Sequence, residues 1–386
     1  MRMIDKLAYL CFLIAKYIGY FILFLFRLIL PVASLFIKRK GVVFYPYAFI
    51  GTDGEYRRIN QFLPYLEKDN IPFHVCTVMD HKKAHAQYEQ GMPQRYLLLI
   101  YVFYRRIFQL TYALRYEHVF IQRGMWPVYF DLENPVLEKT LYAFNKNIVL
   151  DFWDSVFVKQ EKLTVQSLKY AKAVSVSNEF LMEFFTAHHS NVLPFNVSID
   201  LSTYRAKTDY QLHSPIRIVW TGQPHNLVNL SYIEAILAKV HQVHPLVLVV
   251  IGKAAPAFTS IPVEHHEWKK NTFYELLETA DIGIYPERNT VHAKGKSAMK
   301  VMDYLSAGLP MIGVPYGLAE GAVNGEHLLV AEKDEDWQEA FNTLVNDITL
   351  REKLGRTGRK LILDNYSIDE NYKQLLALFS IKKLNG

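Results

Sequence analysis

The chain has 386 residues, of which 51% are hydrophobic and 21% are charged, and its formal net charge is +5. That length suits two domains and the composition excludes a disordered chain, while the small positive charge fits phosphates or lipid headgroups and argues against a nucleic-acid partner. Cys11 and Cys76 are the only cysteines, which excludes a disulfide framework and a cysteine-based zinc site and indicates a reducing compartment.

The N-terminal region is almost wholly apolar from Leu7 to Ile37, which exceeds the ~20 residues that a bilayer span requires. Arg27 is costly in lipid unless it snorkels or pairs, and Pro31 kinks or reverses a helix, so a single span and an in-plane anchor both stay open. A buried core helix is the alternative without a membrane. Lys38-Arg39-Lys40 follow, and this cluster predicts a main body at the cytoplasmic face of the inner or plasma membrane.

Short β-rich runs alternate with amphipathic segments after Gly41, which predicts parallel sheets with right-handed crossovers. Strands are predicted at 42–49, 73–79, 118–123, 148–154, 173–178 and 192–197, with helices at 55–67, 93–116, 133–145, 160–171 and 179–187. The polar stretch 202–215 is predicted to be a linker. The alternation then restarts with strands at 216–222, 246–252, 282–286 and 311–315 and helices at 231–242, 272–279, 297–307, 334–346, 350–364 and 367–381.

The fold class predicted from this pattern is α/β, with two Rossmann-like domains facing a cleft and an N-terminal membrane-associated helix. The expected segments are an anchor at 1–40, an N-terminal domain at 41–205, a C-terminal domain at 206–365 and a last helix at 366–386. In open α/β sheets, ligands bind beyond the carboxyl ends of the strands. The residues that follow each predicted strand are therefore the candidates for a site.

The first such motif is Gly51-Thr52-Asp53-Gly54, directly after the first strand. Two glycines at a strand-to-helix turn allow the backbone to approach a ligand and leave amide groups of the helix start available. A plain tight turn accounts for the motif equally well. The dinucleotide fingerprint G-x-G-x-x-G is absent.

Three charged residues also follow strands of the first half. Arg123 ends one strand, where a guanidinium can pair with a phosphate or carboxylate. Asp151 and Asp154 end the next strand, where carboxylates can bind acceptor hydroxyls, orient Arg123 or cap the following segment. We take these three residues as catalytic candidates, with structural ion pairs as the alternative. No histidine or further acid lies nearby in the sequence, so no metal site is predicted.

The strongest motif runs from Gly295 to Pro310. Gly295 and Ser297 are expected to open a helix whose free amide groups and positive dipole end could hold a diphosphate without a metal. Lys296 and Lys300 add positive charge, and Asp303 suits the hydroxyls of a ribose. A capped amphipathic helix with solvated lysines is the alternative interpretation.

Three further features complete the candidate set. Gly222 ends the first strand of the second half and is expected to line the cleft. Trp268 precedes a short helix and could flank a nucleobase, with core packing as the equal alternative. The aromatic helix of Arg95–Tyr116 could touch lipid headgroups or receive a lipid-linked acceptor, or it could be a core helix with snorkelling arginines.

These residues resemble the GT-B glycosyltransferases of family 4, and the likeness covers most of Val42 to Ile381. Its most specific part is GKSAMKVMDYLSAGLPMIGVPYG, from Gly295 to Gly317. Pro194, Asn196 and Asp200 stand in the family's turn between domains, and Arg123, Glu138, Asp151 and Asp154 match a subgroup with an Arg and an Asp-rich strand end. The family's pair of glutamates is not intact, because Asp303 stands for the second and Gly295 occupies the first position.

The resemblance implies a retaining, metal-independent hexosyltransferase without a cofactor. A nucleotide-diphosphate-sugar donor would bind the C-terminal domain, and a lipid-linked or glycan acceptor of polysaccharide biosynthesis would bind the N-terminal domain. Phosphate oxygens of the leaving group would help to deprotonate the acceptor, so the protein would act by charge stabilisation and positioning. The alternatives are a non-catalytic subunit of a glycan assembly complex and a nucleotide-sugar epimerase.

Overall fold

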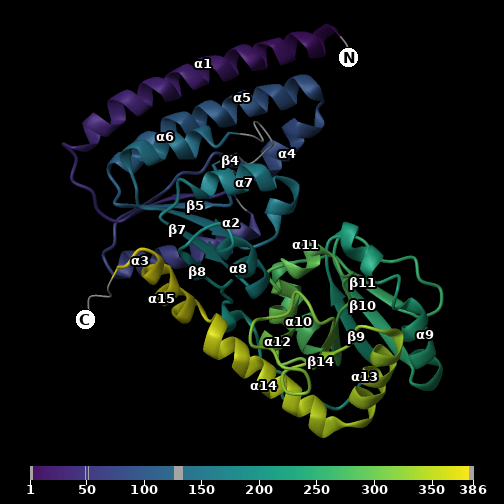
Figure 1. The fold of residues 1–386 in the computed structure, drawn as a ribbon. Coiled ribbons are helices and arrows are strands. Elements are labelled where there is room, and N and C mark those ends of the chain that lie inside the picture. Colours follow the sequence, from purple (N-terminus) through teal and green to yellow (C-terminus); the bar gives the residue numbers. More distant parts are fainter. Residues whose placement is uncertain (1–2, 48, 51, 126–133, 382–386) are drawn as a thin grey trace. The chain divides into compact units, whose positions relative to one another are not determined.

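A computed structural model describes residues 3–47, 49–50, 52–125 and 134–381 of the chain, and it divides the chain into two compact units. Unit 1 comprises Met1–Asn196 together with Tyr372–Gly386, and unit 2 comprises Val197–Asn371. Each unit has one six-stranded parallel sheet with helices on its faces (Figure 1). The predicted α/β class with two Rossmann-like domains is thereby confirmed, while the predicted boundaries at residues 205 and 365 stay predictions.

The sheet of unit 1 has the strand order β3-β1-β5-β6-β7-β8. Its strands are β1 (Val42–Tyr45), β3 (Phe73–Val75), β5 (His118–Gln122), β6 (Ile148–Phe152), β7 (Ala173–Val176) and β8 (Val192–Pro194), and β2 (Phe49–Ile50) pairs separately with β4 (Met79–Asp80). The helices are α1 (Met3–Ser34), α2 (Asp53–Arg58), α3 (Leu63–Lys68), α4 (His81–Glu89), α5 (Met92–Gln109), α6 (Val136–Phe144), α7 (Glu161–Leu168) and α8 (Glu179–Thr186). The central strands β1, β5 and β6 are mostly apolar and are buried along their whole length because helices cover both faces of the sheet.

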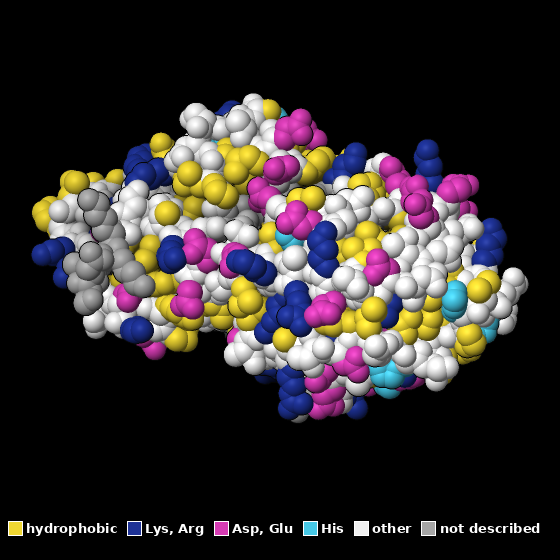
Figure 2. Space-filling view, turned by 90° about the horizontal axis from the view of Figure 1, so that it is seen from below, with side chains coloured by type: hydrophobic (Ala, Val, Ile, Leu, Met, Phe, Trp, Pro, Cys, Tyr) yellow, Lys and Arg dark blue, Asp and Glu magenta, His cyan; other side chains and the backbone are white. Residues whose placement is uncertain are grey.

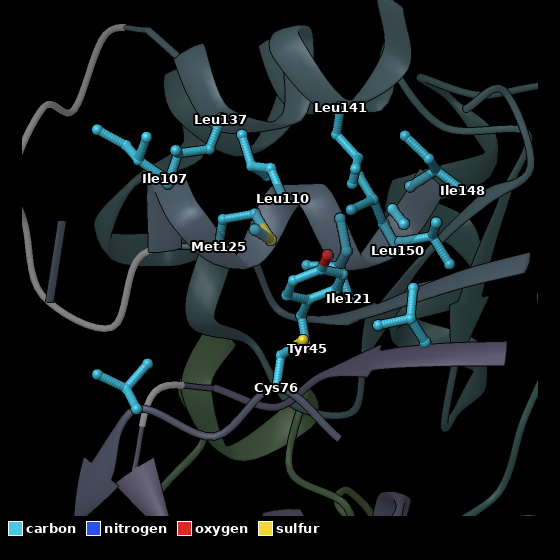
Figure 3. Packing of buried hydrophobic residues seen from close by; sticks show 14 of the residues in the cluster. Tyr45, Cys76, Ile107, Leu110, Ile121, Met125, Leu137, Leu141, Ile148 and Leu150 are labelled. Carbon is cyan, nitrogen blue, oxygen red and sulfur yellow. The ribbon is translucent and has the colours of Figure 1, made fainter. Parts of the chain in front are cut away.

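The core of unit 1 lies between this sheet and the helices α5 and α6. Figure 3 shows Leu137 and Leu141 of α6 above Ile121 of β5 and Leu150 of β6, and all four are fully buried. The helix α1 lies along the outer side of α5 and α6 and forms a further layer (Figure 1). The predicted N-terminal helix is therefore present, and its outward face stays exposed.

The sheet of unit 2 has the strand order β11-β10-β9-β12-β13-β14. Its strands are β9 (Ile216–Thr221), β10 (Leu246–Ile251), β11 (Val263–His266), β12 (Ile282–Tyr285), β13 (Met311–Gly313) and β14 (Leu329–Val330). The helices are α9 (Glu234–Val243), α10 (Lys270–Glu278), α11 (Val291–Lys294), α12 (Met299–Ser306), α13 (Asp334–Asn346) and α14 (Ile348–Tyr366). The last helix, α15 (Ile368–Leu378), begins in unit 2 and belongs to unit 1 from Tyr372 onward. The short strands β11 and β14 and the helix α11 were not predicted.

The stretch 202–215, predicted as a loose linker, instead packs on unit 2. The hydroxyl of Tyr210 donates to the Gly308 carbonyl at 3.1 Å, and Lys207 Nζ donates to the Ala280 carbonyl at 2.8 Å. His213 Nδ1 lies 2.7 Å from the buried carboxylate of Asp281. The linker was predicted because the stretch is polar. Polarity in a sequence does not distinguish side chains that face water from those that form hydrogen bonds to a neighbouring backbone.

Candidate functional site

The sheet of unit 2 reverses its strand order between β9 and β12, because β10 and β11 lie on one side of β9 and β12, β13 and β14 on the other. Ligands of open α/β sheets bind at the carboxyl ends of the strands at such a reversal. Gly222 directly follows β9, and Glu287 lies two residues after β12. These two residues therefore flank the expected binding position of unit 2.

Lys300 of α12 reaches the end of β9. Its Nζ lies 4.9 Å from the ring centroid of Trp220, and a Cβ at Gly222 would lie only 3.2 Å from that Nζ. This nitrogen is buried and has no hydrogen-bond acceptor among the described residues, and its nearest carboxylate oxygen is 3.6 Å away on Glu287. Burial lowers the pKa of Lys300 to about 8, because removal from water disfavours the ammonium form.

Glu287 is the carboxylate around which this cluster is organised, and the sequence interpretation missed it. It is 4% exposed, its Oε1 accepts a bond of 2.7 Å from Lys296, and its Oε2 accepts one of 2.7 Å from Asn229. The Glu287 carboxylate thus faces the two ammonium groups of Lys296 and Lys300. These three charges sum to a net positive charge beside the switch point, which is the place between β9 and β12 where the strand order reverses. The proline before Glu287 marks the end of β12, but the sequence gives no sign that Glu287 turns inward.

The helix that carries Lys300 begins later than predicted. Val291–Lys294 already forms the short helix α11, with Gly295 as its C-cap, and α12 begins only at Met299 after Ala298 in left-handed backbone with φ 54°. The prediction that Gly295 and Ser297 open the helix is therefore wrong. Glycine is much more frequent after a helix end than before a helix start, and that preference applies here.

The start of α12 nevertheless carries the predicted free amide groups. No side chain among the described residues caps this end, and the helix is fixed to the sheet because the Tyr304 hydroxyl accepts a bond of 3.0 Å from the Thr221 backbone. The orphan amides and the positive end of the helix dipole thus lie beside Lys300, in the same turn. Ser297 lies in the connection between α11 and α12.

The two remaining donor-binding candidates lie apart from this cluster. Asp303 is buried, and its Oδ1 accepts a bond of 2.5 Å from the Tyr204 hydroxyl. Trp268 is 51% exposed and follows β11 at the edge of the sheet, with its ring 6.0 Å from that of Phe273. Their roles at the ribose and the nucleobase stay predictions.

A second candidate region lies at the switch point of unit 1, between β1 and β5. A pocket of about 300 Å³ occupies this position, and its lining residues are Tyr47, Thr52, Gly54, His81, Gln122, Arg123 and Trp153. A Cβ at Gly54 would lie 2.5 Å from the Trp153 ring, so only glycine fits there. The predicted residues Thr52, Gly54 and Arg123 are therefore brought together.

Arg123 is held at this pocket by several contacts. It takes left-handed backbone with φ 64°, its guanidinium lies 5.0 Å from the Tyr47 ring centroid and 5.1 Å from that of Trp153, and it pairs with Asp154. A strained backbone at a binding position is typical of functional sites. Tyr47, His81, Gln122 and Trp153 were not nominated from the sequence, because only the tertiary structure places these four residues around one pocket.

Asp151 is not among the residues that line this pocket and instead forms a fully buried ion pair with Arg58. The Nε of Arg58 donates to Oδ2 at 3.0 Å, and the Ser175 hydroxyl donates to Oδ1 at 2.8 Å. Arg58 also donates to the carbonyls of Phe195 and Asn196, where the chain leaves unit 1. The structure thus separates Asp151 from Asp154, which the sequence had grouped.

The other predicted residues of unit 1 are placed only in part. Thr52 caps α2 by accepting a bond of 3.2 Å from the Glu55 backbone. Gly51 and the side chain of Asp53 lie outside the described residues. Glu138 accepts a bond of 2.9 Å from the Met125 backbone, and burial raises the pKa of its carboxyl.

Within the described ranges no group of three or more His, Cys, Asp or Glu side chains could hold a metal ion. The prediction of a reaction without metal or cofactor stays a prediction. The described side chains can supply cations, amide donors and stacking surfaces at both switch points.

Comparisons with known proteins agree with this geometry. Residues 233–377 match a family model described as "Glycosyl transferase-like". A search of curated proteins finds no match. The chain has the GT-B fold, and its residues 233–377 are similar to this glycosyl transferase-like family. Family 4 in particular, which the sequence suggested, stays a prediction.

Solved structures with this fold match almost the whole chain. A sucrose-phosphate synthase from Thermosynechococcus elongatus has a TM-score of 0.61 at 12% identity and covers 89% of this chain and 98% of its own. A glycosyltransferase from Rickettsia africae ESF-5 has a TM-score of 0.62 at 10% identity and covers 89% and 98%. Anabaena Alr3699/HepE, solved in complex with UDP, has a TM-score of 0.61 at 12% identity and covers 88% and 99%.

Proposed function

We propose that the protein is a retaining, metal-independent glycosyltransferase. It takes a nucleotide-diphosphate sugar as donor and transfers the sugar to a lipid-linked or glycan acceptor of polysaccharide biosynthesis at the cytoplasmic membrane face. The observation that carries this proposal is the cluster of Gly222, Lys300 and Glu287 at the switch point of unit 2.

The cluster suits a departing diphosphate. Lys300 brings a buried ammonium group without a hydrogen-bond acceptor to the uncapped start of α12, and Gly222 leaves room beside it. Amide groups and cations that are already fixed in place stabilise developing charge at little reorganisation cost. Asp303 and Trp268 are proposed to bind ribose and base.

Unit 1 is proposed to hold the acceptor. Its pocket at the β1–β5 switch point is lined by rings and by the Arg123 guanidinium, which Asp154 orients. Aromatic faces with a few fixed polar groups are suited to stacking and hydrogen bonding with a sugar. Asp151 is then a positioning residue, since its oxygens accept bonds from Arg58 and Ser175.

Titration calorimetry with UDP, GDP and TDP and their glucose derivatives tests the donor proposal. We expect one nucleotide series to bind, and the nucleotide-sugar to be consumed only when membrane lipid extract is present. Conversion of the sugar nucleotide without an acceptor would instead indicate the epimerase. Binding without turnover in any extract would indicate the non-catalytic subunit, and no binding by any series would remove the proposal.

The pH dependence of nucleotide binding is a second expected result. The ammonium form of Lys300, which attracts the diphosphate, predominates below its pKa of about 8. Affinity should be constant from pH 6 to about 7.5 and fall as the pH rises through about 8, by up to tenfold per unit. Calorimetry across this range should show the fall in the native protein and not in Lys300→Gln.

Unfolding does not account for such a fall. The pKa of Lys300 is about 8 in the folded chain, below the ordinary value of 10.5 for a solvated lysine, so the unfolded chain binds more protons between these values. The contribution of Lys300 to the free energy of unfolding therefore rises with pH in this window. An affinity that stays flat through pH 9 would contradict a contact between Lys300 and the diphosphate.

A further inference from the structure

One face of α1 is packed against the body of unit 1 over most of its length. Phe12, Gly19, Leu23 and Leu30 are its buried residues, and their spacing of seven, four and seven places them on a single stripe. A Cβ at Gly19 would lie 2.3 Å from the ring of Phe103 in α5, so the glycine lets the two helices meet closely.

Further contacts tie the same face to α5. The Phe12 ring lies 5.3 Å from that of Tyr96, and the Tyr20 ring lies 6.0 Å from that of Phe103. The Tyr104 hydroxyl donates to the Ala15 carbonyl at 2.9 Å. The helix α1 is thus a layer of unit 1, and the contacts extend from its first third to Leu30.

The opposite face of α1 is apolar without interruption from Leu7 onward. Its exposed large residues are Leu7, Leu10, Ile14, Tyr17, Ile18, Phe21, Phe24, Leu25, Leu28, Ile29 and Val32, and the exposed Leu35 and Phe36 follow directly after the helix. Such an exposed row exceeds by far the scattered apolar side chains of ordinary protein surfaces. The face in Figure 2, viewed from below, mixes Lys, Arg, Asp and Glu with apolar side chains.

The two interior charges of α1 avoid this outward face. At 3.6 residues per turn, Lys16 and Arg27 fall beside the buried stripe. The Lys16 Nζ lies 5.5 Å from the Tyr20 ring centroid, and Arg27 lines a pocket with Pro135 and Lys139 at the start of α6. A charged flank beside a continuous apolar face is the pattern of a helix that lies in a membrane interface.

A spanning orientation conflicts with these contacts. If α1 crossed the ~30 Å hydrocarbon core, either α5 and α6 would also enter the core, or the contacts of the buried residues of α1 with these helices would be broken. Arg27, far along the helix, would then be exposed to lipid at a large cost. An in-plane orientation keeps every contact and leaves the Arg27 flank toward water and headgroups.

We propose that α1 lies in the plane of an anionic lipid surface. Its outward apolar face is buried at the boundary between headgroups and acyl chains, and α5 and α6 lie on the aqueous side. Lys38 and Lys40, exposed after the helix, face anionic headgroups. This inference rests on the membrane attachment of the proposed function and adds its geometry, which fixes unit 1 beside lipid-linked acceptors.

The sidedness of the two ends of α1 tests the orientation. In a Cys11→Ala background, where the remaining Cys76 is buried, Lys6→Cys and Lys38→Cys are treated with an impermeant maleimide in inverted membrane vesicles. We expect both to react without detergent, because both ends lie on the cytoplasmic side. Reaction of Lys6→Cys only after detergent would show a spanning helix and overturn the inference.

The outward face is tested with purified protein. Phe21→Glu with Leu28→Glu should reduce sedimentation with vesicles of equal parts phosphatidylglycerol and phosphatidylethanolamine by at least about tenfold, and phosphatidylcholine vesicles should bind the native protein more weakly. Lys294→Glu, an exposed change in unit 2, is the matched control. A native protein that dimerises through α1 and does not bind vesicles would overturn the inference.

Nucleotide binding by the released variant is measured separately. Loss of donor binding alone would contradict the proposed function and would not contradict the membrane orientation of α1.

Discussion

Lys300→Ala is expected to lower kcat/KM for the donor by about 10- to 100-fold and to leave the fold intact. The change removes a hydrogen bond from a cation to a phosphate, which contributes about 1.5–3 kcal/mol, and each 1.4 kcal/mol is about tenfold. The Lys300 Nζ makes no hydrogen bond to any described residue, so its removal takes away only the ion pair with Glu287 at 3.6 Å. Steady-state kinetics and nucleotide titration measure the effect.

The matched control for this prediction is Lys294→Ala. Lys294 is exposed at the end of α11, five residues before the first residue of α12, Met299, and it carries the same charge. If the two variants lost activity equally, the effect would be one of general charge and not of the site. A Lys300→Ala protein with unchanged kinetics would remove Lys300 from the donor site.

A second variant, Glu287→Gln, tests the role of the carboxylate beside Lys300. Its carboxylate lies between Lys296 and Lys300, so Glu287→Gln keeps the shape but removes the charge that partly neutralises both lysines. We read Glu287 as a positioning residue, which holds Lys296 at 2.7 Å and lowers the net charge of the cluster. Gln should keep the bond to Lys296 through its amide oxygen, so nucleotide affinity should change far less than in Lys300→Ala.

The strong periodicity of the chain explains why most of the fold was predictable. Continuous apolar runs such as Leu246–Ile251 are typical of buried parallel strands, and α13 was predicted at its observed bounds, Asp334–Asn346. Strands of two residues, such as β4, leave no periodic pattern, and so His81 after it went unnoticed. The start of α12 was misplaced because a short helical turn precedes it.

The candidate site was predictable where local rules place residues at strand ends. Arg123, Gly222 and Lys300 follow from the expectation that ligands bind at that edge. Arg58 did not, because its partner Asp151 lies 93 residues away in the sequence. Glu287 did not either: Lys296 lies only 9 residues away, but Asn229, which binds the other carboxylate oxygen, lies 58 residues away. A charged residue that pairs in the interior looks like any surface charge until the fold is known.

Asp151→Asn is expected to destabilise unit 1 strongly, by about 3–5 kcal/mol, because it leaves the Arg58 guanidinium buried without its counter-charge. Both side chains of this pair are 0% exposed. Asp154→Asn is the matched change three residues along the chain: its side chain and that of Arg123 are 21% and 18% exposed, so water partly screens the pair and a smaller loss of stability than in Asp151→Asn is expected. Urea unfolding followed by circular dichroism measures both.

We therefore expect substitution of Asp151 to reduce mainly the stability of the protein and substitution of Asp154 to reduce mainly its activity. Asp154→Asn should keep the unfolding midpoint and lose turnover, because Arg123 is released from its orientation at the pocket. Asp151→Asn should lower the urea midpoint of unfolding. Replacing both members of the buried pair, Arg58→Met with Asp151→Leu, should recover part of the stability, since no unpaired charge remains buried. Recovery stays incomplete because Arg58 also donates to the carbonyls of Phe195 and Asn196. A stable Asp151→Asn protein without turnover would instead make Asp151 part of the chemistry, and the pocket of unit 1 would then extend to the buried pair.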